Sequence, residues 1–569
     1  MIRQLLAKGM KVFWLLPGFL LWAAYPPMGE MMDCLFALAP LLWLSRNGDT
    51  KTAVRRWFVN GFLFWFATLS WMPAIVKNGG PWPLVVLGWG ALSAYCAAYF
   101  AAFGYLSSKV WSFVRGRRYW WRLAAIIVAE PLLWAGLEII RSRLFGGFAW
   151  NQLGVVPAVG GFGAPAALGG VYLLSVVVVL INGTVASIAE RILAPLLAAR
   201  RRRTLHLKGG DVNIQEDETP SRLDPPRWTR SIETLLPFAL IWGLYSISVK
   251  YGTQPVADGM EGAKVLRVAM VQRNYPCVFM RDRSESPVEV YRNLLGNVSP
   301  LQPELVVLAE SAFSEIGLFG SANAVLFADW IREQSGANGV LAGGVRIADG
   351  KEYNSAALFG DGTVEVYDKV HLVPFGEFIP FDKTITALQR LAPVGSCTPG
   401  ELKTLDFGGM KLGVAICFED TDSAQVRRLA SMGAQALVFI TNDSWFSHSS
   451  EAVQHAWQSV ARSVETGLPV IRVGNSGVTG TIAPLGGFGG TSWLIGSNGK
   501  PLVDVRGTMF DRVAIPPTDE STGHTVLTPY VIAGDAPLFM AFLALVASML
   551  YFEVRRRVSA ANGEIAVHG

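Results

Sequence analysis

The chain has 569 residues, of which 51% are hydrophobic and only 16% are charged, which excludes one large soluble enzyme and favours a membrane protein. The net charge of +5 is unevenly divided: residues 1–254 hold 25 Lys and Arg against 12 Asp and Glu, whereas residues 255–552 hold 21 against 30. Because the positive charge lies between apolar segments and the compact middle is acidic, we expect no nucleic-acid partner.

Eight apolar segments approach the length of about 20 residues that a helix needs to cross a bilayer. Seven precede the acidic region and one follows it; they are 11–27, 31–45, 57–76, 83–106, 122–140, 165–189, 231–249 and 537–552. The second is short for a span and could be partly re-entrant. We therefore predict a membrane domain of about seven transmembrane helices over residues 1–250, and a C-terminal transmembrane helix with a short tail over 535–569.

Every second connection between these segments is rich in Lys and Arg, which marks the cytoplasmic side of a membrane protein. Examples are the N-terminal Arg3, Lys8 and Lys11, the run Arg200–Arg203 and the C-terminal run Arg555–Arg557. Both termini are thus expected in the cytoplasm, and residues 250–536 outside it. The polar stretch 204–230 lacks periodicity and is predicted to be a cytoplasmic linker.

The region 260–525 alternates short apolar runs with amphipathic ones, which predicts an α/β domain whose sheets are covered on both faces. Strands are expected at 265–272, 305–309, 340–344, 355–359, 411–417, 436–441, 469–474 and 478–483. Helices are expected at 322–334, 422–432 and 452–466.

The five cysteines form no CxxC pair and no zinc spacing, so no metal site is predicted. They are Cys34, Cys96, Cys277, Cys397 and Cys417. The first two lie in or beside apolar runs, where cysteine usually packs as a small hydrophobic side chain. An odd number leaves at least one thiol free or paired between chains.

Three predicted strands deliver polar residues where they end: LVVLAES reaches Glu310, KLGVAICFED reaches Cys417, and ALVFITND reaches Asn442. Loops at strand ends commonly carry catalytic groups, because a rigid sheet positions them. A fourth segment, VYDKVHLVPFGEF, contains Lys369, His371 and Glu377 among turn-forming residues.

Each of these residues also has a plain structural explanation. Cys417 could be a buried hydrophobic side chain, and Glu310 could cap the helix that follows it. Lys369 could be a solvated turn residue, and Glu377 a surface charge or its ion-pair partner. Their order and flanking residues favour chemistry over these explanations taken one at a time.

The sequence after Cys417 predicts a sharp strand-to-helix turn, which would place the thiol near a helix N-terminus and lower its pKa. Only His371 among six histidines lies in a polar motif near an apolar run, so a Cys–His pair is the weaker fit. A cysteine served by a glutamate base and a lysine that stabilises negative charge is the better match.

These motifs resemble the nitrilase, or carbon-nitrogen hydrolase, superfamily: LAES with Glu310, DKVHLVPFGEF with Lys369 and Glu377, and ICFED with Cys417. TNDSWF (441–446) and GNSGVTGTIAP (474–484) extend the match. With apolar segments before and after, and GGFAWNQLG at 146–154, the whole chain is similar to the apolipoprotein N-acyltransferase family.

The resemblance implies a four-layer αββα domain on the outer face of a bacterial inner membrane, attached to a multi-pass helical domain. It implies a Glu310–Lys369–Cys417 triad, with Glu377 and Glu419 in support. The implied reaction transfers an acyl group from a phospholipid to the amino terminus of an S-diacylglyceryl-cysteine lipoprotein through a Cys thioester. Membrane lipid surrounds the site, and no metal or organic cofactor is needed.

Two positions depart from the family pattern: Phe418 stands where Tyr is common, and Arg281 where Trp is common. We expect them, with Asn442 and Trp445, to concern substrate binding. A membrane-anchored amidase or nitrilase that transfers its acyl group to water has the same triad, although a single anchor would suffice for it. A non-enzymatic scaffold is a third alternative, and the intact Glu, Lys, Glu and Cys set argues against it.

Overall fold

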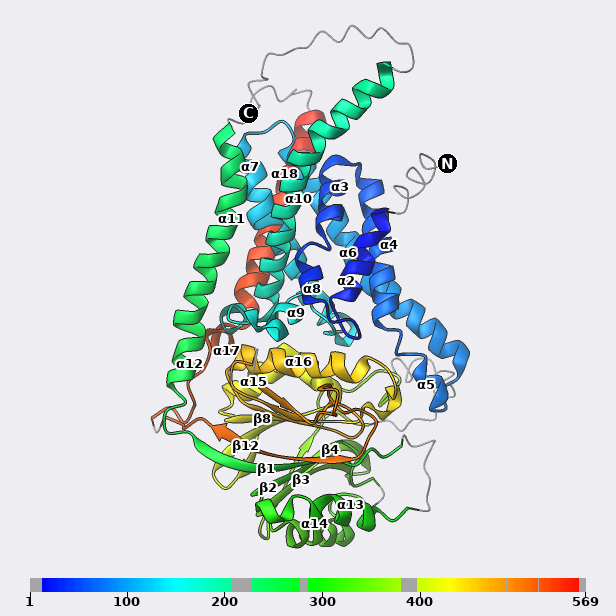
Figure 1. Ribbon diagram of the computed structural model, residues 1–569, viewed down its shortest axis with the longest axis vertical. Coiled ribbons are helices and arrows are strands. Elements are labelled where there is room, and N and C mark those ends of the chain that lie inside the picture. The colour runs from blue at the N-terminus through cyan, green and yellow to red at the C-terminus, as the bar shows by residue number, and fades with distance from the viewer. Residues whose placement is uncertain are drawn as a thin grey trace.

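The chain forms a bundle of helices and an α/β domain, which Figure 1 shows one above the other in a computed structural model. The structure describes residues 13–206, 227–276, 285–314, 316–379, 397–486, 490–519 and 521–561. Most of the predicted cytoplasmic linker lies outside the described residues, as do Cys277 and Arg281.

Within the described residues, five helical stretches are long and apolar enough to cross a membrane. They fall on the predicted segments from the fourth onward. They are α6 (Trp82–Val114), the Tyr119–Arg141 stretch that contains α7 (Tyr119–Ala124) and α8 (Glu130–Arg141), α10 (Ala166–His206), α11 (Arg227–Ser248) with its continuation to Asp258, and α18 (Ala536–Ala561).

The first three predicted segments form shorter pieces. They contain α2 (Leu16–Ala23), η2 (Met31–Leu35), α3 (Ala39–Asn47), α4 (Thr50–Thr68) and α5 (Ala74–Lys77). The second segment breaks because the Asn182 side chain of α10 accepts hydrogen bonds from the backbone N–H groups of Leu38 and Ala39, at 2.8 and 3.0 Å. Asn182 thereby supplies the start of α3 with partners inside the bundle, where no water is at hand.

The α/β domain contains two six-stranded sheets. The first has the order β12-β1-β2-β3-β4-β5, with β1 (Lys264–Gln272), β2 (Leu305–Leu308), β3 (Gly339–Ala348), β4 (Lys351–Phe359), β5 (Val364–Asp368) and β12 (Gly507–Ile515). The second has the order β11-β10-β9-β8-β7-β6, with β6 (Leu405–Phe407), β7 (Met410–Ile416), β8 (Ala436–Thr441), β9 (Val470–Gly474), β10 (Gly480–Ile482) and β11 (Thr491–Trp493). All eight predicted strands are present; β5, β6, β11 and β12 were not predicted.

The layers follow from side chains that alternate along the strands. Val268 and Met270 of β1 pack between the two sheets, whereas Ala269 and Val271 pack against the outer helices of the first sheet. The outer helices are α13 (Pro287–Gly296) and α14 (Ala322–Ser335) on the first sheet, and α15 (Ser423–Ser431) and α16 (Glu451–Thr466) on the second. The domain is therefore the predicted four-layer αββα fold.

Helix α16 lies between the second sheet and the membrane bundle (Figure 1). Its buried residues contact the sheet through Val460 and the bundle through Ala461 and Val464. Strand β2 pairs in parallel with β1, and β7 pairs in parallel with β8. Glu310, Cys417 and Asn442 each follow the carboxyl end of one of these strands, where the chain leaves the sheet.

Candidate active site

Cys417 lies on a sharp turn directly after a central strand. Strand β7 ends at Ile416, and Cys417 begins the short 3-10 helix η10 (Cys417–Thr421) with a φ angle of 54°. A left-handed backbone is uncommon for a side-chain-bearing residue and persists only where its surroundings hold it. The predicted strand-to-helix turn is therefore present, with the thiol half-buried at its corner.

Glu419 holds this turn together. Its carboxylate accepts hydrogen bonds from the backbone N–H groups of Ile416 (2.8 Å), Val370 (2.7 Å) and His371 (3.0 Å). The Tyr367 hydroxyl contacts both carboxylate oxygens at 3.0 Å. Glu419 thus ties the loop that carries Lys369 to the turn that carries Cys417.

Glu310, Lys369 and Glu377 meet at the strand ends. The Lys369 ammonium lies 2.9 Å from Glu377 Oε1 and 3.8 Å from Glu310 Oε1, and only 1% of its side chain is exposed. Lys369 is therefore not the solvated turn residue of the simpler explanation, and Glu377 is its ion-pair partner. Glu310 does not cap a helix, since the next helix, α14, begins at Ala322.

Asn354 of β4 joins the two carboxylates, although the sequence analysis did not single it out. Its side-chain N–H₂ group donates to Glu310 Oε1 at 2.7 Å and to Glu377 Oε1 at 2.6 Å. The amide fixes both oxygens on one side while Lys369 faces them on the other. A polar Asn at the start of the apolar run SAALF is the signal that would have found it.

The two glutamates have opposite pKa shifts. Burial raises the pKa of the Glu310 carboxyl, and the negative charge of Glu377 adds to this against the Lys369 ammonium. Burial also acts to raise the pKa of Glu377, but the close Lys369 ammonium and hydrogen bonds from Val373 and Asn354 hold it below its usual value. Pairs of carboxyls separated in this way commonly divide the roles of proton carrier and fixed charge.

The pKa of the Cys417 thiol is raised, contrary to the sequence-based expectation. Burial is the main cause, and the negative charge of Glu310 adds to it, while the Lys369 ammonium opposes both. The prediction failed because η10 is only five residues long and the thiol is desolvated. A protonated resting thiol needs a base to become a nucleophile, and Glu310 is the neighbouring carboxyl whose own pKa is raised.

Phe418 lies under aromatic side chains of the membrane domain. Its ring stacks with Phe148 at 6.1 Å and Trp150 at 6.5 Å between centroids, and His371 meets its edge at 5.6 Å. Phe148 and Trp150 belong to the GGFAWNQLG segment noted in the sequence. The residue after the candidate nucleophile is therefore positioned by both domains.

Asn442 and Trp445 lie in the turn after β8. The Asn442 side-chain oxygen accepts bonds from the Ser444 hydroxyl (2.7 Å) and the Asn475 amide (2.9 Å), which stabilises the turn. The Trp445 carbonyl accepts a bond from Asn78 of the membrane domain at 2.7 Å. The structure thus gives both residues local contacts, and their predicted role in substrate binding stays a prediction.

A second buried polar cluster lies behind Cys417. His455 of α16 contacts Asp420 at 2.9 Å and Asp443 at 3.0 Å, and Arg472 of β9 pairs with the same two carboxylates. Burial opposes the charged form of His455, but Asp420 and then Asp443 raise its pKa to about 10. Asp443, His455 and Glu451 are close enough to bind a metal ion, but the Arg472 guanidinium already supplies positive charge there.

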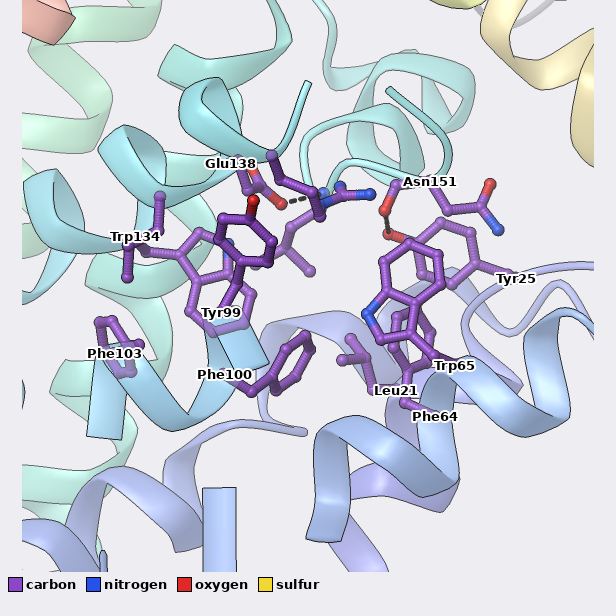
Figure 2. Close-up of a pocket in the computed structure, with 13 residues that line it drawn as sticks. Leu21, Tyr25, Phe64, Trp65, Tyr99, Phe100, Phe103, Trp134, Glu138 and Asn151 are labelled. Atoms are coloured by element: carbon purple, nitrogen blue, oxygen red, sulfur yellow. Dashed lines mark hydrogen bonds between the residues drawn. The ribbon is translucent and has the colours of Figure 1, made fainter. Parts of the chain in front are cut away.

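The membrane domain also contains a small pocket, shown in Figure 2, between α2, α4, α6 and α8. Its lining is mostly aromatic, with Glu138, Arg141 and Asn151 as polar members. Glu310, Lys369 and Cys417 are not among its lining residues. We therefore do not assign the reaction to this pocket.

Comparison with known proteins matches both parts of the chain. Residues 17–184 match the family model described as apolipoprotein N-acyltransferase N-terminal domain, and residues 322–522 match the carbon-nitrogen hydrolase model. The chain is 30% identical over 503 residues to the apolipoprotein N-acyltransferase of Geobacter metallireducens, covering 84% of this chain and 86% of that protein. It is 28% identical over 537 residues to that of Nitrosomonas europaea, covering 92% and 93%.

Among solved structures, the carbon-nitrogen hydrolase from Helicobacter pylori G27 is similar to 44% of this chain, over 89% of its own length. The sequence identity is 18% and the TM-score is 0.33.

Proposed function

Because this chain belongs to the apolipoprotein N-acyltransferase family and is an acyltransferase, we propose that it moves an acyl chain from a phospholipid to the amino-terminal S-diacylglyceryl-cysteine of bacterial lipoproteins, through Cys417. The observation that carries the proposed mechanism is the buried Glu310–Lys369–Glu377 cluster, in which the charges of Glu310 and Lys369 act on the Cys417 thiol. One such cluster serves both half-reactions.

In the first half-reaction, Glu310 removes the proton of the Cys417 thiol, and the thiolate attacks an ester carbonyl of the phospholipid. Lys369, with backbone N–H groups near Cys417, stabilises the oxyanion of the tetrahedral intermediate. The C–O bond of the ester then breaks, and the proton on Glu310 passes to the departing alcohol oxygen. A thioester on Cys417 and a lysophospholipid result.

In the second half-reaction, the α-amine of the lipoprotein attacks the thioester carbonyl. Glu310 takes a proton from the attacking nitrogen, the C–S bond breaks, and the proton returns to the sulfur of Cys417. The products are an N-acylated lipoprotein and the starting enzyme. Glu377 keeps Lys369 in place by its 2.9 Å ion pair, and no step draws on a metal or organic cofactor.

The membrane domain is proposed to hold this site at the surface of the bacterial inner membrane. The alternation of basic loops supports cytoplasmic termini and a periplasmic α/β domain. Both substrates carry acyl chains that lie in the bilayer, so the encounter becomes largely a matter of local positioning.

Intact-protein mass spectrometry after incubation with phospholipid alone tests the mechanism. The wild-type protein should gain the mass of one acyl chain, which hydroxylamine removes and a diacylglyceryl peptide with a free amino terminus discharges. Cys417→Ala should gain nothing, whereas Cys397→Ala, the matched control, should acylate normally. An N-acetylated peptide should leave the adduct in place.

The competing hydrolase transfers the acyl group to water. Release of free fatty acid at the same rate with and without the peptide would favour it over the acyltransferase mechanism. An adduct that survives Cys417→Ala would place the nucleophile elsewhere.

A further inference from the structure

Helix α16 presents one stripe of residues to the membrane domain. Gln454, Gln458, Ala461 and Glu465 are spaced by four, three and four residues, so they lie on a single face of the helix. All four are buried. At one end of this stripe Gln454 contacts Trp150, and at the other end Glu465 contacts Val171. Both partners belong to the membrane domain and lie more than 290 residues away in sequence.

Gln454 has the most contacts in the stripe. Its side-chain oxygen accepts bonds from the Trp150 indole (3.0 Å), the Asn151 amide (3.2 Å) and the Trp71 indole (3.4 Å). Its side-chain nitrogen donates to the carbonyls of Pro26 (2.9 Å) and Thr68 (3.2 Å), and to Ser450 of its own helix (3.1 Å). The two N–H groups and two lone pairs of the amide are thus shared among six partners, five of which belong to the membrane domain.

Figure 2 shows where part of this contact leads. Asn151, which donates to Gln454, lies beside Tyr25, whose hydroxyl donates to the Asn151 carbonyl at 3.3 Å. The contact thus extends from α16 into the wall of the bundle. At the other end of the stripe, Glu465 accepts a bond from the backbone N–H of Val171 in α10 at 2.8 Å.

His455, the residue after Gln454, contacts the turn that carries Cys417. His455 Nε2 lies 3.3 Å from the carbonyl oxygen of Cys417 and 2.9 Å from Asp420, both in η10. Trp150 touches both neighbours, because its indole donates to Gln454 and its ring lies 5.4 Å from the His455 ring. Two consecutive residues of one rigid helix therefore connect the membrane domain to the turn that carries Cys417.

We propose that Gln454 is a positioning residue that fixes Cys417 relative to the membrane domain, so that membrane-borne acyl donors reach the thiol. The inference rests on the proposed function for the identity of the donor. Gln454 does not touch the reacting atoms, so its loss should impair reactions with lipid in a bilayer and spare reactions with a small ester that diffuses from water.

The variant Gln454→Glu tests this, because it keeps the shape of the side chain but turns the donor toward Pro26 and Thr68 into an acceptor. Acylation of Cys417 is measured with two probes: vesicles of phosphatidylethanolamine and phosphatidylglycerol, and p-nitrophenyl acetate in water. The rate with vesicles should fall by about tenfold to a hundredfold, the range expected for a displacement of about 1 Å. The rate with p-nitrophenyl acetate should stay within about twofold of wild type.

The matched control is Gln435→Glu. Gln435 is a buried amide of the same size whose nitrogen donates to Pro516 at 3.0 Å and whose oxygen accepts from Lys411 at 3.3 Å, all within the α/β domain. It should affect both probes equally. Trp71→Phe, which removes one donor and keeps an aromatic ring, should show a smaller loss confined to vesicles.

Hydrogen exchange supplies a readout that needs no substrate. Gln454→Glu should speed exchange in residues 66–72 and 148–155, and leave β7 and β8 as protected as in wild type. Equal losses with both probes, or unchanged exchange and unchanged vesicle rates, would overturn the positioning role. A wild-type protein that reacts with p-nitrophenyl acetate but not with phospholipid would instead contradict the proposed donor, and the exchange experiment would still decide the role of Gln454.

Discussion

Replacing Glu419 by Gln should loosen the turn that presents Cys417, although neither the charge nor the shape of any reacting group is altered. The carboxylate accepts backbone N–H groups with both oxygens: Ile416 with one, Val370 and His371 with the other. A glutamine offers one oxygen and one N–H₂ group. Whichever way the amide is turned, its N–H₂ group faces a buried backbone N–H.

The loss of stability is worked out for the orientation of the glutamine amide that loses fewer hydrogen bonds. If the amide oxygen faces Val370 and His371, the 2.8 Å bond from Ile416 is lost, while the Tyr367 hydroxyl keeps its contact with the remaining oxygen. A hydrogen bond to a charged acceptor contributes about 1.5–3 kcal/mol, and the orphaned N–H adds a desolvation cost, so we expect a loss of about 2–4 kcal/mol. This corresponds to a fall of about 4–16 °C in the apparent Tm of a domain of this size.

Acylation should also slow, because Ile416 directly precedes the nucleophile. A displacement of about 1 Å at Cys417 would slow acylation by about a hundredfold. The assay is the initial rate of acyl adduct formation, alongside thermal unfolding. Glu365→Gln is the control. The carboxylate of the exposed Glu365, near the start of β5, also accepts a hydrogen bond from a backbone N–H, that of Asp406 at 2.9 Å. An acylation rate within twofold of wild type, with an unchanged Tm, would refute the role of Glu419 in holding the turn that carries Cys417.

Three further predictions concern proton transfer, orientation of the base and topology. Glu310 must be ionised to accept the thiol proton, so acylation should fall as the pH drops through the raised pKa of Glu310. Glu377→Gln removes one cause of the raised pKa, so the acidic limb of the pH–rate profile should move to lower pH. A shift of this limb to higher pH would contradict the assignment of Glu310 as the base. Asn354→Leu should slow acylation by about a hundredfold or more, since it removes the bond that orients Glu310, and a rate like that of wild type in single-turnover experiments would exclude this role. In intact cells, a membrane-impermeant thiol reagent should label Asp361→Cys on the exposed face of the α/β domain but not Arg556→Cys in the tail, and the reverse pattern would overturn the orientation.

The sequence could single out Glu310 and Cys417 because each follows a run of apolar residues that predicts a buried strand, and Lys369 because it lies in a polar motif among turn-forming residues. Strands β2 and β7 belong to different sheets, so the packing of one sheet on the other, which the strand pattern does not report, brings Glu310 and Cys417 into one site. The four strands that were missed lack that signal: β6 and β11 are three residues long, and β5 and β12 mix polar and apolar residues.

Other parts of the site depend on tertiary contacts between segments that are far apart in sequence. Asn354 stands inside β4, where an amide is expected to face solvent, and its bonds run to residues on two other segments. The direction of the Cys417 pKa shift depends on burial from all sides, which the length of the following helix does not indicate. Gln454 likewise belongs to an amphipathic helix whose buried face gives no sign that its partner is the membrane domain.

The contact between Glu465 and Val171 has a consequence for how the protein is made. Helix α10 is interrupted at Gly169 and Gly170, and the φ angle of Gly170 is 67°. The helix resumes at Val171, whose backbone N–H needs a hydrogen-bond partner. That partner lies 294 residues further along the chain, so at about 5–20 residues per second it emerges some 15–60 s after Val171. The start of this membrane helix therefore gains its last partner only when α16 of the α/β domain docks against it, so the bundle and the α/β domain complete their folding together.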